Sequence, residues 1–465
     1  MKFFVVHPAL KTEMREFLKL ALPLSSAQVA QAMTGFVDTV MMGWLGQESL
    51  AAGGLAVMVF MSFLMTGIGV LSSVSPLVAE AYGAQQPLRV GRVTRQGLWL
   101  ALLMAIPSLP VIANLDGLMA VLGQDPSVIT LTDTYLDVAR WGLLPGLGFA
   151  VLRGTVTSLS QARPIMVIVV AANLLNIVGN YLLAFGNLGF PALGIAGLAL
   201  ASALAHTTMC LSLLGYILWH RRGVFKPYRL FHQLHSLEPV VLRSLLKIGL
   251  PIGISTILEH GLFTVMTFMM GALGTHVLAA HQLALQTVVV IFMVPLAMSY
   301  AATIRVGQWY GQRNWVGVRR AAMVSVSSAI AVMFMAAIIF LTLPEPIISV
   351  YLDVNDPINQ DVLQIGVTLL TVAGFGQVVD GIQRTANGVL QGLQDTRVPM
   401  LLGIFAYWCI GLLLGYWLGF HTPLGGVGIW IGSYVGLAVA AAAYIWRFRV
   451  LLVRKSQSSV TFVNG

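Results

Sequence analysis

Three of the acidic residues inside apolar stretches of the sequence, where a carboxylate is hardest to accommodate, are candidates for a functional site. They are Asp38 in GFVDTVMMG, Glu259 in ILEHGLF and Asp380 in VVDGIQR. An ionisable side chain inside a membrane span costs about 2.5–3.5 kcal/mol on insertion scales and so indicates a functional site. Asp38 and Glu259 have no basic residue three or four positions away, whereas Arg384 follows Asp380 by one helical turn and offers it a structural pair. We predict that Glu259, Asp380 and Asp38 carry cation or proton chemistry.

Asparagines in the segment NLLNIVGNYLL form a second candidate set. Asn176 and Asn180 are four residues apart and share one face of a helix. They either hold neighbouring helices together by hydrogen bonds or complete, with Ser202, a polar cavity around Asp38. Both readings stay open at this stage.

Other polar residues within apolar stretches favour structural roles. Asp137 and Arg140 are three residues apart, so a pair on one helix satisfies both. His206 and His281 are interpreted as packed histidines rather than proton relays.

The composition shows which solvent surrounds these residues. Of 465 residues, 57% are hydrophobic and 9% are charged. A water-facing surface needs roughly 25–35% charged residues, so most of the exterior must face lipid. At ~20 apolar residues per span plus a connection, the chain has room for about twelve transmembrane helices. The fold class is therefore all-α and polytopic.

Twelve apolar stretches fit that expectation. They fall near 18–44, 49–79, 94–114, 130–158, 164–186, 194–219, 242–270, 276–309, 317–343, 361–391, 398–420 and 426–452. Lys and Arg concentrate in the two terminal segments and the even-numbered connections, whereas Glu48, Asp116, Asp125, Glu345, Asp353 and Asp356 occupy odd-numbered ones. Positive residues are retained on the cytoplasmic side, so both termini are predicted to be cytoplasmic.

The chain also repeats itself at an offset of 228 residues. That shift places Lys19, Leu22, Pro23, Met41, Met42, Gly43, Gly46, Leu50, Ala51 and Ala52 on identical residues without a gap. Each half then holds six spans, and an even number gives both halves the same orientation, related by a pseudo-twofold axis along the membrane normal. We predict an N-lobe at 1–219, a cytoplasmic linker at 220–241 and a C-lobe at 242–465.

Several function classes are disfavoured by what the sequence lacks. Both cysteines, Cys210 and Cys409, lie in apolar stretches, which argues against a disulfide framework or a Cys-rich metal site. No nucleophile elbow, HExxH or Walker-type sequence occurs, so neither an enzyme nor an ATP-driven pump is expected. The net charge of +9 is dispersed between apolar runs, unlike a nucleic-acid-binding surface.

The motifs together resemble the multidrug and toxic compound extrusion (MATE) family, in its bacterial NorM-type branch. The resemblance covers nearly the whole chain and is carried by QVAQAMTGFVDTVMMG (28–43), NIVGNY (176–181), LPIGISTILEHGLFTV (250–265), LAAHQLALQ (278–286), TIRVGQWYGQ (303–312) and VVDGIQRTANGVLQGLQDTR (378–397). It implies a Na⁺- or H⁺-coupled antiporter in the bacterial inner membrane. Such a protein exports organic, often cationic, compounds by alternating access of two lobes, with no cofactor beyond the coupling ion.

The resemblance also assigns roles to residues. Glu259 and Asp380 match the C-lobe cation site, where they would ligate a metal only if the ion is Na⁺. Asp38, Asn176, Asn180 and Ser202 match the N-lobe polar cavity. Arg384 departs from the branch, and Phe292 stands where some members place a tyrosine. We expect a monomer that handles small organic substrates and contacts membrane lipid.

Three alternatives remain beside this reading. A lipid-linked oligosaccharide flippase of the same superfamily would be expected to line its cavity with basic groups for pyrophosphate, whereas this chain offers acids. An exporter dedicated to one metabolite would share every feature above. From another class, an ion channel would need no alternating access. The sequence identifies neither the natural substrate nor the coupling ion, which could be Na⁺ or H⁺.

Overall fold

The computed structural model describes residues 8–121, 123–352 and 356–461. Within these ranges the chain is helical and contains no strand. Lys2 and Asp353, two of the charges used to predict orientation, lie outside the described residues. The longer helices are α1 (Pro8–Trp44), α2 (Gln47–Leu71), α3 (Val74–Gly83), α4 (Pro87–Ile112), α6 (Pro126–Ala139), α7 (Leu143–Ser158), α8 (Arg163–Phe185), α9 (Ile195–Trp219), α10 (Pro239–Ala272), α11 (Thr275–Gly311), α12 (Trp315–Thr342), α14 (Gln360–Gly392) and α17 (Gly426–Thr461). Short helices α5 (Asp116–Val121) and α13 (Pro344–Ile348) lie in connections, and α15 (Arg397–Ile404) continues through a π-helical segment (Phe405–Leu412) into α16 (Leu413–His421).

All twelve predicted spans are helical, although the helices extend beyond several of the predicted bounds. In the described part of the chain, ten helical segments are long and apolar enough to cross a membrane by themselves. The other two are the first and fourth predicted spans. The first, in α1, carries Gln28, Gln31 and Asp38, which lower its hydropathy, and the fourth is broken by one 3₁₀ turn (Arg140–Gly142) between α6 and α7.

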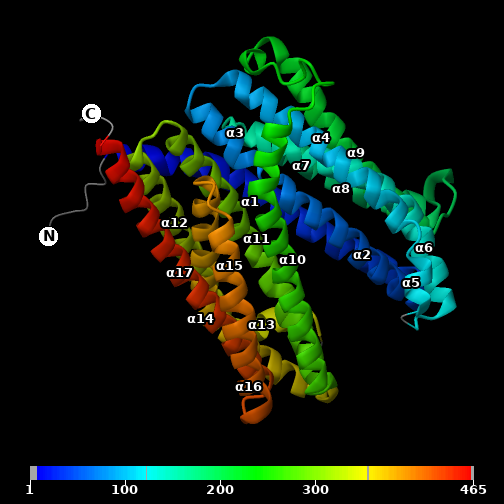
Figure 1. Ribbon diagram of the computed structural model, residues 1–465. Coiled ribbons are helices and arrows are strands. Elements are labelled where there is room, and N and C mark those ends of the chain that lie inside the picture. The colour runs from blue at the N-terminus through cyan, green and yellow to red at the C-terminus, as the bar shows by residue number, and fades with distance from the viewer. Residues whose placement is uncertain (1–7, 122, 353–355, 462–465) are drawn as a thin grey trace. The chain divides into compact units, whose positions relative to one another are not determined.

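Packing divides the helices into two units with separate apolar cores (Figure 1). Residues 26–253, here the N-unit, surround one core, and residues up to 25 together with 254–465, here the C-unit, surround the other. In the N-unit α8 lies against α9 and α2 against α6, and in the C-unit α14 lies against α11, α12 and α17. The units differ from the predicted lobes in two segments: the start of α1 belongs to the C-unit and the start of α10 to the N-unit. The predicted lobe boundaries stay a prediction.

The start of α1 is held in the C-unit by a buried ion pair. Glu13 accepts hydrogen bonds from Arg305 Nε and Nη2, both at 2.8 Å, and from the Trp309 indole at 2.9 Å. Its exposure is 2%, so the carboxylate depends on these donors. Phe17 and Leu20, on the same segment, are fully buried. This first part of α1 is therefore an integral element of the C-unit.

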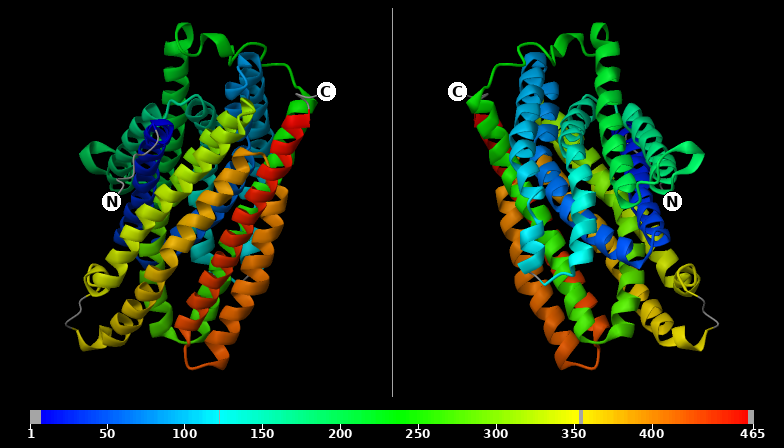
Figure 2. Two further views of the ribbon diagram at one scale, coloured as in Figure 1. Left: turned by 90° about the vertical axis from the view of Figure 1, so that its left-hand side faces the viewer. Right: turned by 90° about the vertical axis from the view of Figure 1, so that its right-hand side faces the viewer.

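The start of α10 makes an equally close approach to the N-unit. A Cβ on Gly249 would stand 2.1 Å from the carbonyl oxygen of Val70, and one on Gly253 would stand 2.7 Å from the Val70 side chain. Only glycine allows the two helices to meet at this distance. Just before α10, residues 220–238 form the connecting stretch drawn in green at the top of both views in Figure 2.

Backbone geometry confirms the internal repeat. Residues with a positive φ recur at matching places of the two halves, which the predicted offset or a slightly longer one relates: Gly46 (116°) and Gly274 (129°), Gln85 (56°) and Arg313 (54°), Ser160 (64°) and Gln394 (61°), Gly194 (57°) and Gly425 (53°). Left-handed backbone is rare outside glycine, so its retention at Gln85 and Arg313 shows that the connection after the second span folds identically in each half. The two halves thus share one six-helix design.

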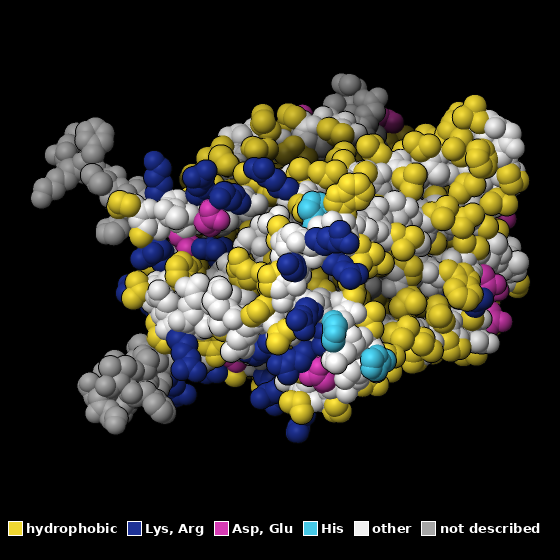
Figure 3. All heavy atoms as spheres, turned by 90° about the horizontal axis from the view of Figure 1, so that it is seen from above, with side chains coloured by type: hydrophobic (Ala, Val, Ile, Leu, Met, Phe, Trp, Pro, Cys, Tyr) yellow, Lys and Arg dark blue, Asp and Glu magenta, His cyan; other side chains and the backbone are white. Residues whose placement is uncertain are grey.

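Charged side chains form a few defined contacts and a cluster on the surface, and the predicted orientation stays a prediction. Figure 3, seen from above the view of Figure 1, shows Lys and Arg side chains clustered on this face. Asp137 and Arg140 pair at 3.0 Å as predicted. Near the end of α3, Glu80 accepts a hydrogen bond from Arg89, at the start of α4, at 2.7 Å.

The Glu13 pair gives a stability prediction. Glu13→Ala leaves Arg305 buried without its carboxylate, and breaking such a pair costs about 3–5 kcal/mol. Glu16→Ala, three residues away, removes only a pair with Lys19 in which both side chains are substantially exposed (48% and 33%), where the median cost is about 0–1 kcal/mol. Thermal unfolding in detergent should show a much lower Tm for Glu13→Ala than for Glu16→Ala. Equal shifts would contradict the role given to Glu13.

Candidate functional site

The N-unit site is centred on Asp38, which α1 presents to α8 and α9. Asn180 donates from Nδ2 to Asp38 Oδ1 at 2.5 Å. The Asn176 amide satisfies both of its polar atoms when its nitrogen donates to the same oxygen at 3.0 Å and its oxygen accepts from Ser202 Oγ at 3.2 Å. The structure therefore brings Asp38, Asn176, Asn180 and Ser202 into one hydrogen-bonded cluster.

Burial of the amides shows that the cluster is built into the helix bundle. Asn180 is fully buried and Asn176 is 2% exposed, whereas Asp38 keeps partial access. Tyr135 on α6 is also buried, and its hydroxyl reaches Ser202. No sequence motif indicated Tyr135, because the residues around it do not show that α6 packs against α9. Asn173, in the same asparagine series, stays apart, and its amide nitrogen has no hydrogen-bond partner in the described part of the chain.

Neutral amides do not cancel the charge of Asp38. Across the described residues, no Lys, Arg or His forms an ion pair or hydrogen bond with this carboxylate. Hydrogen bonds hold it in place and leave one negative charge within the bundle. A proton, a metal ion or a cationic ligand is what such a site accepts.

The C-unit site contains two acids and one guanidinium. Arg384 Nη1 donates to Glu259 Oε2 at 2.9 Å and to Oε1 at 3.2 Å. Arg384 therefore pairs directly with Glu259 on α10 rather than with Asp380, one turn away on its own helix, and the coupling role of Asp380 stays a prediction. Sequence spacing could not show this contact, because residues 125 positions apart form it.

Asp380 lies next to this pair without sharing its hydrogen bonds. It is 8% exposed, and in the described part of the protein no side chain donates a hydrogen bond to it. Gln377, one turn earlier on α14, is fully buried, and neither atom of its amide has a partner among the described residues. With all three groups ionised, two carboxylates and one guanidinium leave a single net negative charge, as ionised Asp38 does in the N-unit.

Aromatic groups surround Arg384. Its guanidinium lies 5.5 Å from the centre of the Phe292 ring, in cation–π range, so Phe292 does provide the aromatic contact expected at this place. Tyr407, in the π-helical segment, accepts a short hydrogen bond from Gln383, the neighbour of Arg384. Single π-bulges frequently mark functional sites, and neither this one nor Tyr407 was indicated by the sequence.

Asp38 has a non-acidic counterpart at the matching position of the other half of the repeat. The predicted counterpart of Asp38 is Met266, and the structure places Ser433 Oγ 3.0 Å from Met266 Sδ. Ser433 is itself the repeat partner of Ser202, which serves the Asp38 cluster. The same position is thus polar in the N-unit and occupied by a thioether in the C-unit, so the two sites are related but chemically different.

His281 has a structural role. Its Nδ1 accepts from the Trp430 indole at 3.0 Å, so the neutral ring carries its proton on Nε2, which faces Thr267 Oγ1 at 3.1 Å. The ring is fully buried, and both nitrogens have partners. His206 likewise contacts the carbonyl oxygen of Ser202 at 2.8 Å. These contacts favour the packing interpretation over a proton relay.

Metal-ligating chemistry beyond these acids is limited. Over the described residues, no group of three or more His, Cys, Asp or Glu side chains comes together. A Na⁺ ion at Glu259 and Asp380 would depend on neutral oxygen atoms for its remaining ligands. That metal site stays a prediction.

Comparison with known proteins places this arrangement in a family. The sequence model of the MatE family matches residues 23–182 and 251–417. The chain is 59% identical over 451 residues to a probable multidrug resistance protein NorM of Synechocystis, covering 97% of each chain. It is 46% identical to a NorM protein of Synechococcus, covering 94% of each, and 36% identical to one of Pseudomonas aeruginosa, covering 97% of this chain and 93% of that one.

Solved structures show the same fold at lower identity. A MATE crystal structure in complex with MaL6 has a TM-score of 0.86 at 22% identity, covering 96% of this chain and 97% of that one. A eukaryotic MATE transporter has a TM-score of 0.82 at 18% identity, covering 97% and 99%. The chain therefore belongs to the multidrug and toxic compound extrusion (MATE) family of transporters, in its bacterial NorM-type branch.

Proposed function

We propose that this protein is a secondary active multidrug exporter, which moves organic cations out of the cell in exchange for inward Na⁺ or H⁺. The observation that carries the proposal is the balance of ionisable groups: each unit holds one carboxyl group, Asp38 or Asp380, that no basic side chain pairs with among the described residues. When ionised, such a carboxyl group is neutralised by a coupling cation or by a cationic substrate. Competition between the two for these charges lets inward ion movement drive outward drug movement.

The excess of acidic over basic groups at each site argues against one of the alternatives, the flippase. A lipid-linked oligosaccharide flippase would need basic groups at its site, whereas each site here has a net negative charge. An exporter of a single metabolite remains compatible. No step requires a catalytic group, and we propose that the protein is not an enzyme. The proposed orientation, with both termini cytoplasmic in the inner membrane, rests on the clustered Lys and Arg residues (Figure 3).

Transport in proteoliposomes tests the proposal. Purified protein is reconstituted with ethidium, and Na⁺ and pH gradients are imposed in separate experiments. We expect saturable ethidium movement against its own gradient in response to one of them. Ion flux without saturation and without ethidium dependence would identify a channel and overturn the proposal.

Asp38→Asn should abolish the N-unit charge while keeping a side chain that Asn180 can still contact. Two opposite charges ~4 Å apart attract by roughly 4 kcal/mol near a protein surface, so loss of the charge that would hold the cation should lower ethidium efflux by about tenfold or more. Asp137→Asn is the matched control, because it removes an acid of the same type from a half-exposed pair with Arg140. Efflux by this control should be close to that of the unchanged protein. Similar losses in both variants would point to a folding defect.

Variants of the C-unit site can test whether transport requires its net charge or the Glu259 carboxylate in particular. Glu259→Gln leaves a net charge of zero, Arg384→Gln leaves −2, and the double variant restores −1 through Asp380. If net charge decides function, each single variant loses gradient-driven efflux and the double variant recovers a measurable part of it. A double variant as inactive as Glu259→Gln would show instead that the Glu259 carboxylate itself is required. Membrane insertion, measured by fluorescence-detected size-exclusion chromatography, controls for misfolding.

A further inference from the structure

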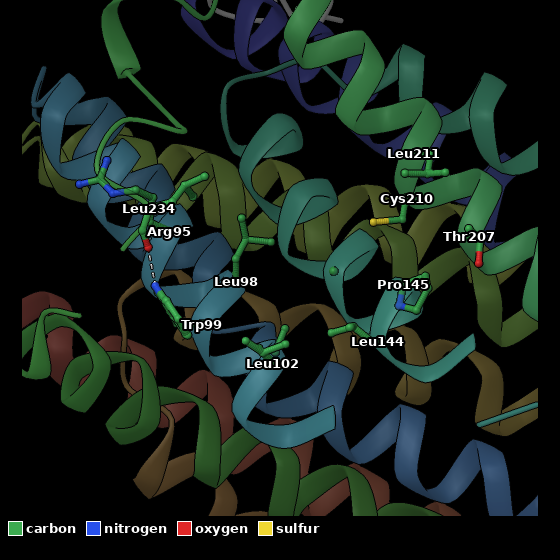
Figure 4. A pocket seen from close by; sticks show the side chains of 12 residues that line it. Arg95, Leu98, Trp99, Leu102, Leu144, Pro145, Thr207, Cys210, Leu211 and Leu234 are labelled. Carbon is green, nitrogen blue, oxygen red and sulfur yellow. Dashed lines mark hydrogen bonds between the residues drawn. The ribbon is translucent and has the colours of Figure 1, made fainter. Parts of the chain in front are cut away.

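A groove of about 410 Å³ lies in the N-unit between α4, α7 and α9. Figure 4 shows Leu98 and Leu102 of α4 along one wall, facing Leu144 of α7 and Leu211 of α9. Cys210, Pro145, Ala101, Gly148 and Thr207 also line the groove, whose surface is almost wholly apolar. The volume falls within the ~300–1,000 Å³ of small-molecule sites. None of the acids of the proposed transport sites lines this groove.

The linker closes one end of the groove and is firmly attached there. Leu234 lines the groove, and its carbonyl oxygen accepts a hydrogen bond from the Trp99 indole at 2.6 Å (Figure 4). Gln96 donates to the Ser236 carbonyl at 2.7 Å. A Cβ on Gly91 would stand 2.2 Å from the Tyr228 carbonyl oxygen, so glycine is needed for the linker to lie against α4. The closed end is therefore a fixed wall.

This end of the groove is positively charged. Arg95 lines it and donates to the Arg229 carbonyl at 3.3 Å. Arg95 and Arg92 lie 3.8 and 3.7 Å from the two oxygens of one acid, Glu238. Two guanidiniums thus share one carboxylate. Arg229, whose backbone carbonyl lies beside Arg95, carries a further positive charge on an exposed side chain. The local balance is opposite in sign to that of the transport sites.

We propose that the groove binds an anionic phospholipid of the cytoplasmic leaflet. One acyl chain lies between α4, α7 and α9, and the phosphate meets Arg92 and Arg229. The solvent of these helices is lipid, and apolar walls accept a hydrocarbon chain. Basic groups between helices on the cytoplasmic side recognise anionic head groups. Leu237 (52% exposed) and Val240 (79% exposed) offer further apolar contact beside the linker.

The same features disfavour a transported cation as the occupant. An organic cation would meet surplus positive charge at the closed end, and its own charge would have no acid other than the shared Glu238. The proposal depends on the orientation proposed above only for the choice of leaflet. Lipid binding in detergent does not depend on the choice of leaflet, so the lipid proposal can fail or succeed independently of the proposed transport mechanism.

Native mass spectrometry of the full-length protein tests the proposal. Delipidated protein in detergent is mixed with equal amounts of phosphatidylglycerol and phosphatidylcholine that carry identical acyl chains. We expect preferential retention of one phosphatidylglycerol. Arg92→Gln and Arg229→Gln should each weaken that retention about fivefold and leave phosphatidylcholine unaffected. Cys210→Phe, which fills the groove, should reduce retention of both lipids.

Arg320→Gln is the matched control, because Arg320 is the repeat counterpart of Arg92 and belongs to the C-unit, whereas every residue that lines the groove belongs to the N-unit. Equal retention of the two lipids, equal effects of Arg92→Gln and Arg320→Gln, or no effect of groove filling would each overturn the proposal. Displacement of the lipid by ethidium would also overturn it by identifying a substrate site. If Cys210→Phe does not fold, as judged by size-exclusion chromatography, Leu102→Phe replaces it.

Discussion

An unneutralised carboxylate inside a membrane-spanning bundle is the constraint on which most of this structure depends. Desolvation makes the bare charge costly, and the protein meets that cost differently in its two units. In the N-unit, buried amides hold Asp38 without cancelling its charge. In the C-unit, Arg384 cancels one of two acids and leaves the other. The surrounding helices, with their buried asparagines, π-helical segment and tyrosine–glutamine contact, keep these groups in place and leave one charge per unit available to a cation.

Duplication explains how one scaffold supports both solutions. The repeated positive-φ positions preserve the connections between helices, so substitutions inside the bundle change chemistry without changing the path of the chain. Met266 with Ser433 and Asp38 with Ser202 show this directly, because a thioether in one unit occupies the position of a carboxylate in the other. The exchanged starts of α1 and α10 follow the same repeat: the border between the units falls after Ser25 and after Gly253, which are 228 residues apart.

Much of this architecture is readable from sequence because hydropathy, charge bias and repetition each act along the chain. The twelve spans and the Asp137–Arg140 pair follow from local spacing. The grouping of Asp38 with the asparagines does not, because Asp38 lies 142 positions from Asn180; it is one of the two interpretations that the sequence leaves open, and the family resemblance implies it. The partner of Arg384 cannot be read from local spacing. Asp380 on its own helix and Glu259 on α10 are both possible partners, and the packing of the helices determines which of them Arg384 contacts. Tyr135 and Tyr407 were missed for the same reason: an ordinary apolar helix shows no sign of which side chain faces a polar neighbour.

Charge balance also bears on how tightly the proposed exchange is coupled. A unit with one negative charge becomes neutral with one proton, one Na⁺ or one monocationic drug, whereas an empty unit keeps its charge. Changing access while empty would carry that charge through a low-dielectric barrier. If the cost is close to the roughly 2.5–3.5 kcal/mol of a buried ionised group, the empty protein changes access about a hundredfold more slowly than the loaded one. In the proposed mechanism, slow return of the empty protein would make exchange obligatory, and the buried charge would serve both as the binding determinant and as the barrier against leak.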